Sequence, residues 1–237
     1  MDYVLDTHIH TISSGHAYST LTENAAAARK AGMRLIAITD HGPMTPGSAN
    51  YLYFLNFKAV PRFVEGVEIL AGVELSMLND KGDLDLGNEV LRHLDLVIAS
   101  FHGVCMEPIG ADGHTRALVN TMKNPYVRII GHLCDPSYPF HVEEVVRAAK
   151  ETGTIIELNN NCLKPGSRRL DREAALLMYR LCNELNVHMV AASDAHYHAG
   201  VGKLDHAKAF ADEAGIKEEL ILNTNLERFK AVLKEGK

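Results

Sequence analysis

The sequence lacks several features, and each absence argues against a class of protein. No apolar run approaches the roughly 20 residues that a membrane-spanning helix needs, so we expect no bilayer span. The residues before His8 contain no basic stretch followed by an apolar one, so we expect no signal peptide and a cytoplasmic location. Neither a GxSxG nor a GxxxxGK(S/T) motif occurs, so we predict no serine nucleophile elbow and no phosphate-binding P-loop.

Cysteine and basic residues are also sparse. The four cysteines form no CxxC pair, so we interpret them as reduced thiols, some of them buried: Cys105, Cys134, Cys162 and Cys182. The chain has 24 basic and 30 acidic residues, and its net charge of −6 argues against a nonspecific nucleic-acid binder. We therefore expect no stable nucleic-acid partner, although this charge is compatible with an enzyme that acts on a nucleotide.

Seven short apolar runs read as buried strands, and predicted helices separate most of them. The predicted strands are Tyr3–His8, Arg34–Thr39, Val67–Val73, Asp95–Ser100, Val127–Gly131, Thr154–Leu158 and Val187–Ala192. The predicted helices cover 22–32, 115–123, 142–150, 171–185, 205–214 and 226–234. This alternation predicts parallel βα units in a single α/β domain, 1–237, because an α/β barrel commonly uses about 200–250 residues.

Two connections have a pattern of their own. Residues 43–61 predict a long loop with one helix, whose aromatic side chains pack the loop onto the body. Asn79-Asp80-Lys81-Gly82 has the chemistry of a hairpin turn.

Polar side chains follow nearly every predicted strand on its carboxyl side. They are His8, His10, Asp40, His41, Glu74, His102, His132, Asn159, Asn160, Asp194 and His196. An open sheet brings ligand residues mainly to one crevice, whereas the carboxyl ends of barrel strands meet on the active-site face. This placement favours a closed or distorted barrel, in which residues distant in the sequence converge.

The ligand types in this set indicate a metal centre. Imidazole and carboxylate groups without thiolates suit zinc, manganese or iron. With His16 added, the set is too large for one tetrahedral ion and could serve two or three ions with a bridging carboxylate. Clustered divalent ions lower the pKa of a bound water and neutralise charge on a phosphoryl group, so the pattern favours phosphoester hydrolysis.

Taken in order, these motifs resemble those of the PHP (polymerase and histidinol phosphatase) superfamily over roughly residues 4–200. The matching segments are His8-Ile9-His10 with a following His16, Thr39-Asp40-His41, Gly72-Val73-Glu74, Phe101-His102, Gly131-His132 and Ser193-Asp194-Ala195-His196. The length and spacing are most similar to the stand-alone bacterial phosphatases of that family. The resemblance implies a distorted (β/α)7 TIM-like barrel and a trinuclear centre, usually of zinc.

The resemblance also implies a role for each matching residue. One ion would be held by His8, His10, Glu74 and Asp194. Glu74 would bridge to a second ion, held also by His102 and His132. The third ion would be held by His16, His41 and His196. The candidate catalytic residues are Asp40, Glu74 and Asp194, and Asp40 would either orient a histidine ligand or shuttle a proton.

We therefore predict a metal-dependent phosphoesterase that hydrolyses a small phosphomonoester with a metal-activated water. The alternatives are a phosphodiesterase or exonuclease on short nucleotides, an amidohydrolase-type barrel, and a noncatalytic metal-binding module. Loops 43–65 and 160–170 would determine which substrate is bound. The sequence does not decide between a monomer and a homo-oligomer. Candidate phosphate-binding residues lie in these predicted loops: Lys58, Arg62, Lys164, Arg168 and Arg169.

Overall fold

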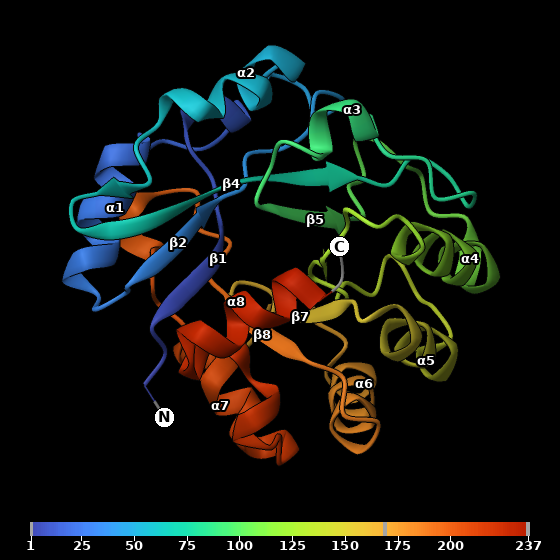
Figure 1. Cartoon of the computed structure of the whole chain (residues 1–237). Coiled ribbons are helices and arrows are strands. Elements are labelled where there is room, and N and C mark those ends of the chain that lie inside the picture. Colours follow the sequence, from blue (N-terminus) through green and yellow to red (C-terminus); the bar gives the residue numbers. More distant parts are fainter. Residues whose placement is uncertain (1, 168–169, 236–237) are drawn as a thin grey trace.

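The computed structural model describes residues 2–167 and 170–235, which form a parallel β-barrel surrounded by helices (Figure 1). The parallel strands are β1 (Leu5–Ile9), β2 (Leu35–Ile38), β4 (Val67–Ser76), β5 (Leu96–Ser100), β6 (Ile129–Ile130), β7 (Ile155–Asn159) and β8 (Met189–Ala192). They pair in this order around the barrel, and the short β3 (Phe63–Val64) adds antiparallel to β4. The predicted α/β barrel of seven parallel strands is confirmed.

The barrel is distorted where β1 meets β8, because side chains replace part of the strand ladder. At the carboxyl ends a single bridge joins Ile9 to Ala195. Between the start of β1 and β8, the buried amide of Asn223 donates to the carbonyls of Leu5 and Ala191, at 3.0 and 2.7 Å, and accepts from the Ala191 amide at 2.7 Å. Asn223 therefore closes the barrel in place of a direct backbone pair.

Helices alternate with the strands and cover the outside of the barrel. They are α1 (Leu21–Lys30), α2 (Tyr51–Leu55), α3 (Asn88–Leu91), α4 (Gly110–Met122), α5 (Val142–Thr152), α6 (Arg172–Glu184), α7 (Asp205–Ala214) and α8 (Leu226–Glu235). Helix α1 begins at a capping box in which Thr20 and Glu23 each accept from the other's backbone amide. It ends two residues before Gly32, whose φ of +80° suits glycine.

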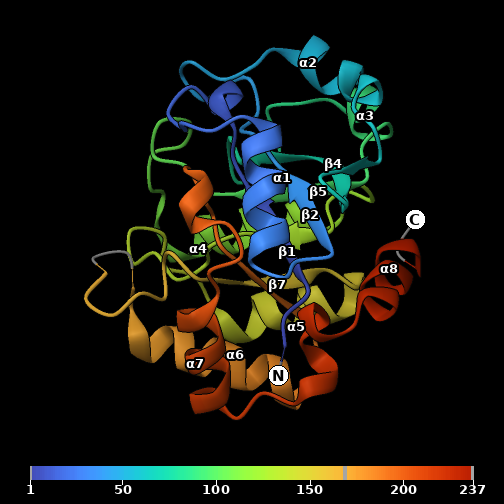
Figure 2. The ribbon, with the colours of Figure 1, turned by 90° about the vertical axis from the view of Figure 1, so that its left-hand side faces the viewer.

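Helix α8 covers the end of the barrel where the strands begin, and the opposite end stays open. Phe229 of α8 is fully buried in the same apolar cluster as Leu5, Leu35 and Leu96, which begin or lie near the start of their strands. In Figure 2, α8 lies at the right, and the loops that follow the strands lie towards the left. The carboxyl ends of the strands are therefore the open face.

The loop over residues 43–61 contains α2 and a short 3-10 helix, Asn56–Ala59. Phe54 and Phe57 are buried and pack the loop onto the body, as predicted. Tyr53 differs from Phe54 and Phe57, because it also makes a polar contact. Its hydroxyl donates to Asp40 at 2.7 Å, so it contacts a residue behind the predicted site. The predicted turn at 79–82 is present, with the Leu78 amide donating to the Asp83 carbonyl at 2.9 Å.

The cysteine prediction was wrong for one pair. Cys134 and Cys162 form a disulfide, whereas Cys105 and Cys182 are free. The two bonded residues follow β6 and β7, and adjacent parallel strands bring the loops that leave them together. Their separation of 28 residues carries no such signal, because the pairing depends on the closed sheet.

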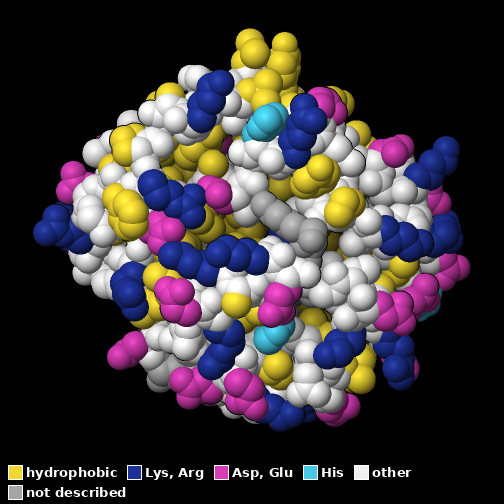
Figure 3. All heavy atoms as spheres, viewed as in Figure 1, with side chains coloured by type: hydrophobic (Ala, Val, Ile, Leu, Met, Phe, Trp, Pro, Cys, Tyr) yellow, Lys and Arg dark blue, Asp and Glu magenta, His cyan; other side chains and the backbone are white. Residues whose placement is uncertain are grey.

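The face seen in Figure 1 is drawn as spheres in Figure 3, where basic and acidic side chains are interspersed. Hydrophobic side chains gather at its top over α2, where Tyr51 and Leu52 are exposed. In residues 2–167 and 170–235, no helix combines the length and the apolar character that crossing a membrane requires.

Candidate metal centre

The structure brings all nine predicted metal ligands to the open end of the barrel. They are His8, His10, His16, His41, Glu74, His102, His132, Asp194 and His196, and every predicted ligand except His16 lies at or just after the carboxyl end of a parallel strand. Side chains at i and i+2 of a strand point to the same side, which places His8 and His10 together with ring centroids 5.0 Å apart.

Glu74 lies at the centre of the cluster and is 1% exposed. Its Oε1 is 3.0 Å from Nε2 of His132 and 3.2 Å from Nε2 of His102. Its Oε2 is 2.8 Å from Nδ1 of His41 and 3.3 Å from Nε2 of His8. Because each oxygen faces a different set of histidines, this carboxylate has the geometry of a bridge between two cations.

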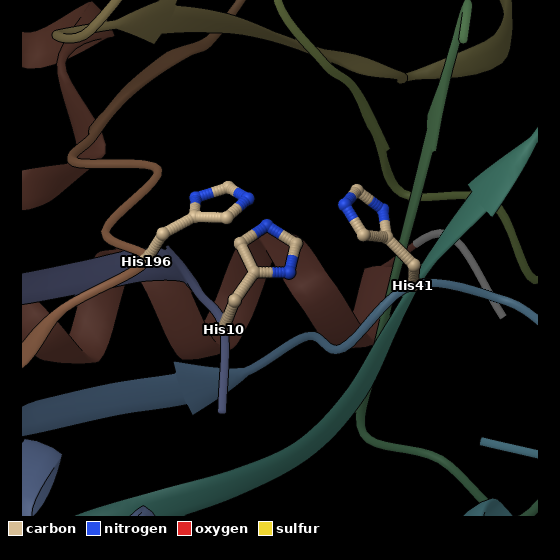
Figure 4. Close-up of side chains that lie close together, drawn as sticks. All are labelled: His10, His41 and His196. Atoms are coloured by element: carbon tan, nitrogen blue, oxygen red, sulfur yellow. The ribbon is translucent and has the colours of Figure 1, made fainter. Parts of the chain in front are cut away.

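Asp194 supplies the second carboxylate. Its Oδ1 lies 3.4 Å from Nε2 of His10, 3.5 Å from Nδ1 of His196 and 3.8 Å from Nε2 of His8. Beyond it, Nε2 of His196 is 3.0 Å from Nε2 of His16. Figure 4 shows that the rings of His10, His41 and His196 converge from three different segments of the chain.

The donor atoms fit a metal because several are buried without a hydrogen-bond partner. They are Nε2 of His8, Nε2 of His10, Nδ1 of His41, Oε2 of Glu74 and Nε2 of His102. Leaving buried polar atoms unpaired is costly, and each of these atoms faces other potential ligands. Three groups have ligand atoms within 4.8 Å of one another: His8–His10–Asp194, His41–Glu74–His102 and His10–His41–His196. Cations between these atoms would satisfy them.

The electrostatics of the cluster also suit cations. Burial raises the pKa of Glu74, but His8, His102 and His41 outweigh burial and hold that pKa well below its usual value. Burial lowers the pKa of His8, but the carboxylates of Glu74, Glu157 and Asp194 reverse this and raise it well above its usual value. The surroundings of His8 therefore stabilise positive charge, as a metal site requires.

Asp40 is fully buried behind the cluster, and the Ser14 hydroxyl lies between it and His10. Ser14 donates to Oδ1 of Asp40 at 2.6 Å, and its Oγ is 2.9 Å from Nδ1 of His10 and accepts from the His41 amide at 3.2 Å. The other oxygen of Asp40 accepts from Thr11 and Tyr53. Both oxygens are thus engaged away from the pocket, so the geometry fits an orienting role for Asp40.

Sequence reasoning did not single out Glu157, Ser14 or Ser76. Glu157 is fully buried in β7, and its Oε1 is 2.7 Å from Nδ1 of His8. Oγ of Ser76 is 2.9 Å from Nδ1 of His102. The signal for Glu157 was available, because a carboxylate inside an apolar strand must have buried partners.

The open face holds a pocket of about 490 Å³. Besides metal-ligand candidates, it is lined by Thr45, Pro46, Phe101, Gly103, Val104, Asp135 and Tyr138. The candidate phosphate-binding residues lie elsewhere. Lys58 and Arg62 line a separate pocket, and Lys164 lines a neighbouring one that shares Asp194 and His196 with the metal cluster. Arg168 and Arg169 lie outside the described residues.

The two asparagines that follow the predicted sixth strand make hydrogen bonds beside the cluster. Nδ2 of Asn159 donates to Asp194 at 3.3 Å, and Oδ1 of Asn160 accepts from the amides of His206 and Ala207 at the start of α7. His114 is fully buried outside the cluster, and its Nε2 accepts from the Ile109 amide at 2.9 Å.

Comparisons with known proteins show which family and which proteins this chain resembles. The PHP domain model matches residues 6–188. A probable phosphatase of Thermoanaerobacter sp. (strain X514) is 49% identical over 238 residues, which cover 100% of this chain and 97% of that protein. A probable phosphatase of Acetivibrio thermocellus is 43% identical, with 100% and 98% covered. The crystal structure of histidinol phosphate phosphatase from Lactococcus lactis, complexed with zinc, L-histidinol and phosphate, has a TM-score of 0.59 at 18% identity, with 91% and 95% covered.

Proposed function

This chain belongs to the PHP domain family, as its motifs predicted, and on that premise we propose that it is a metal-dependent phosphatase of small phosphomonoesters. Relatives that cover its whole length are named probable phosphatases. The observation that carries the proposal is the convergence of unpartnered buried nitrogens on the two oxygens of Glu74. Such a set has little use in a barrel that binds no cation.

The proposed centre holds three ions, zinc in the first instance, with manganese or iron as alternatives. We call the first two the inner ions: one held by His8, His10, Glu74 and Asp194, and one by Glu74, His102 and His132. The outer ion would be held by His16, His41 and His196. Imidazole and carboxylate donors without thiolates suit these metals, and the Lactococcus lactis protein contains zinc.

When bound, the ions would polarise the phosphate and lower the pKa of a bound water. The protein residues supply the rest. Glu74 would bind both inner ions, because its Oε2 faces His8 and its Oε1 faces His132. Burial raises the pKa of Asp194, but His8 and His10 outweigh it and hold that pKa below its usual value. Asp194 is therefore ionised near neutral pH, and it can accept a hydrogen bond from the attacking water and orient it.

The pocket indicates the kind of leaving group. Its walls include Pro46, Phe101, Val104 and Tyr138, and among residues 2–167 and 170–235 it is lined by no lysine or arginine. Phe101 and Tyr138 stack with ring centroids 4.7 Å apart, and the Tyr138 hydroxyl donates to the Met106 carbonyl, which fixes this wall. The ions would therefore bind the phosphate, while the walls accept a compact, largely apolar leaving group.

The test compares metal content with turnover. Protein purified without added metal is analysed by mass spectrometry and assayed with a phosphomonoester and a phosphodiester, before and after chelation. We expect up to three ions per chain, chelator-sensitive hydrolysis and a preference for the monoester. Glu74→Gln should lower turnover by more than about 100-fold, since even loss of a residue behind a ligand costs about 10–100-fold. Bound metal without any hydrolysis would instead support a noncatalytic module, and a diester preference would support a phosphodiesterase.

A further inference from the structure

Glu157 occupies an unusual position for a carboxylate that the predicted ligand set does not include. It lies within β7, the parallel strand that supplies none of the predicted ligands, and it is fully buried. An ionised carboxylate in such a place is stable only if its oxygens have partners. Both oxygens of Glu157 are engaged, and each contacts a different candidate ligand of the inner ions.

The first contact fixes the protonation of His8. Oε1 of Glu157 is 2.7 Å from Nδ1 of His8, while Oε2 accepts from the His132 amide and from Asn159. A carboxylate at Glu157 can only accept, so this arrangement assigns the proton of the hydrogen bond to Nδ1 of His8. Nε2, which faces Oε2 of Glu74 at 3.3 Å, is then the ring nitrogen available to bind an ion.

The second contact holds an uncommon backbone conformation. His132 has a φ of +29°, a strained conformation that a residue other than glycine keeps only where its surroundings enforce it. Its amide donates to Oε2 of Glu157 at 2.7 Å. This bond fixes the turn that places Nε2 of His132 3.0 Å from Oε1 of Glu74.

Asn159 extends the contact to a third ligand. Its Nδ2 donates to Oε2 of Glu157 at 3.0 Å and to Oδ2 of Asp194 at 3.3 Å. The Cys162 amide donates to Oδ1 of Asn159 at 2.9 Å, which orients the amide group so that its NH2 faces the two carboxylates. Asp194 also has a positive φ, +54°, so this residue too is held in an uncommon conformation.

We propose that Glu157 and Asn159 form a positioning unit that holds His8, His132 and Asp194 in the geometry that the two inner ions need; this rests on the metal centre proposed above. The outer ligands His16 and His196 are oriented by backbone carbonyls. Nδ1 of His16 faces the Ser14 carbonyl at 3.1 Å, and Nδ1 of His196 faces the Asp194 carbonyl at 3.1 Å. The side chains of the unit contact ligands of the inner ions and reach the outer site only through Asp194, so the inner ions should weaken more than the outer ion when the unit is disrupted.

Glu157→Gln tests the unit with little change in shape. Glutamine has one acceptor oxygen, so its NH2 must face either Nδ1 of His8 or the two donors from His132 and Asn159. The first arrangement forces Nδ1 to accept and moves the His8 proton to Nε2, which then cannot bind an ion. In the second arrangement the glutamine NH2 faces the His132 amide and the Asn159 NH2, so hydrogen-bond donors face one another.

The readout is the number and affinity of bound zinc ions, measured by mass spectrometry and by competition with a chromophoric chelator. For Glu157→Gln we expect both inner ions to weaken at least about 10-fold and the outer ion to remain. For Asn159→Ala, which among the inner ligands loses only the contact with Asp194, we expect one inner ion to weaken. Wild-type affinity at both inner positions in Glu157→Gln, or equal weakening of all three ions, would overturn the proposal.

Glu68→Gln is the matched control. Glu68 is also a buried carboxylate, but it pairs with Arg62 and Lys230 rather than with candidate metal ligands. The Glu68→Gln protein should bind all ions as the wild type does.

If Glu157→Gln does not fold, Glu157→Asp is the second variant. It keeps the charge but cannot reach both partners, and wild-type affinity for the inner ions in that variant would equally overturn the proposal. Because the readout is metal binding, a wild-type protein that binds three ions without hydrolysing phosphoesters would refute the proposed function alone.

Discussion

The Nε2 atoms of His16 and His196 lie 3.0 Å apart, although the two residues are separated by 180 positions in the chain. One arrives through the loop after β1 and the other through the loop after β8. Burial, His196 and His41 together lower the pKa of His16, so its ring tends to be neutral. Nδ1 of each ring faces a backbone carbonyl, so the two Nε2 atoms are the ring nitrogens that a cation between them can use. This pair is more exposed than the ligands around Glu74, so the outer ion should be the easiest to remove.

His196→Ala should therefore remove one ion and leave two. The inner ions keep their proposed ligands, and the metal content per chain after gel filtration measures the change. His198→Ala is the control, because Nδ1 of His198 faces Oγ of Ser19 at 3.1 Å rather than the cluster. Unchanged metal content in His196→Ala, or loss of every ion, would contradict the assignment of the outer site.

The position of the candidate ligands could be read from the sequence because two rules of strand geometry determine it. Residues i and i+2 share a side, which pairs His8 with His10, and parallel strands in a barrel direct their carboxyl ends to one face. Glu74, His102 and His132 needed only the second rule. These features depend on local pattern alone, so neither the loops nor the packing had to be known.

Other features depend on contacts between strands, which a single sequence does not reveal. The role of Glu157 follows from its neighbours on β1 and β6, and the Cys134–Cys162 bond follows from adjacent loops. The paths of the long loops could not be predicted from the sequence either. Lys58 and Arg62 were candidates for the open face, but the loop carries them to a separate pocket.

Asn223→Ala should lower the free energy of unfolding by about 2–4 kcal/mol. The change leaves buried backbone groups of Leu5 and Ala191 without partners, and each such group costs about 1–3 kcal/mol. Denaturant unfolding of metal-free protein measures the effect. Asn161→Ala, at an exposed loop position, should stay within about 0.5 kcal/mol of the wild type. A similarly small effect for Asn223→Ala would mean that water replaces its amide at the β1–β8 junction.

Loss of the disulfide should also destabilise the chain. Replacing both Cys134 and Cys162 with serine frees a segment with a sequence separation of 28, and the chain-entropy relation gives a loss of about 3–4 kcal/mol. Unfolding of metal-free protein is again the measurement, with Cys105→Ser as the control. A thiol titration of the denatured, unreduced wild type should find two free thiols, and four would restore the interpretation that all cysteines are reduced.

Val104→Ser should change which phosphomonoesters the enzyme prefers. Val104 is 66% exposed and lines the pocket beside Phe101 and Tyr138, where the leaving group would lie. The ratio of kcat/KM for 3-phenylpropyl phosphate to that for glycerol 3-phosphate should fall about 4–15-fold, because each methyl group removed from an apolar contact is worth about 0.8 kcal/mol. Both substrates have primary alkyl leaving groups, so the ratio reports contact with the wall more than bond reactivity. Leu177→Ser, which alters an equally exposed side chain on α6, should leave the ratio unchanged. A wild-type enzyme that prefers glycerol 3-phosphate would show that the apolar wall does not select the leaving group.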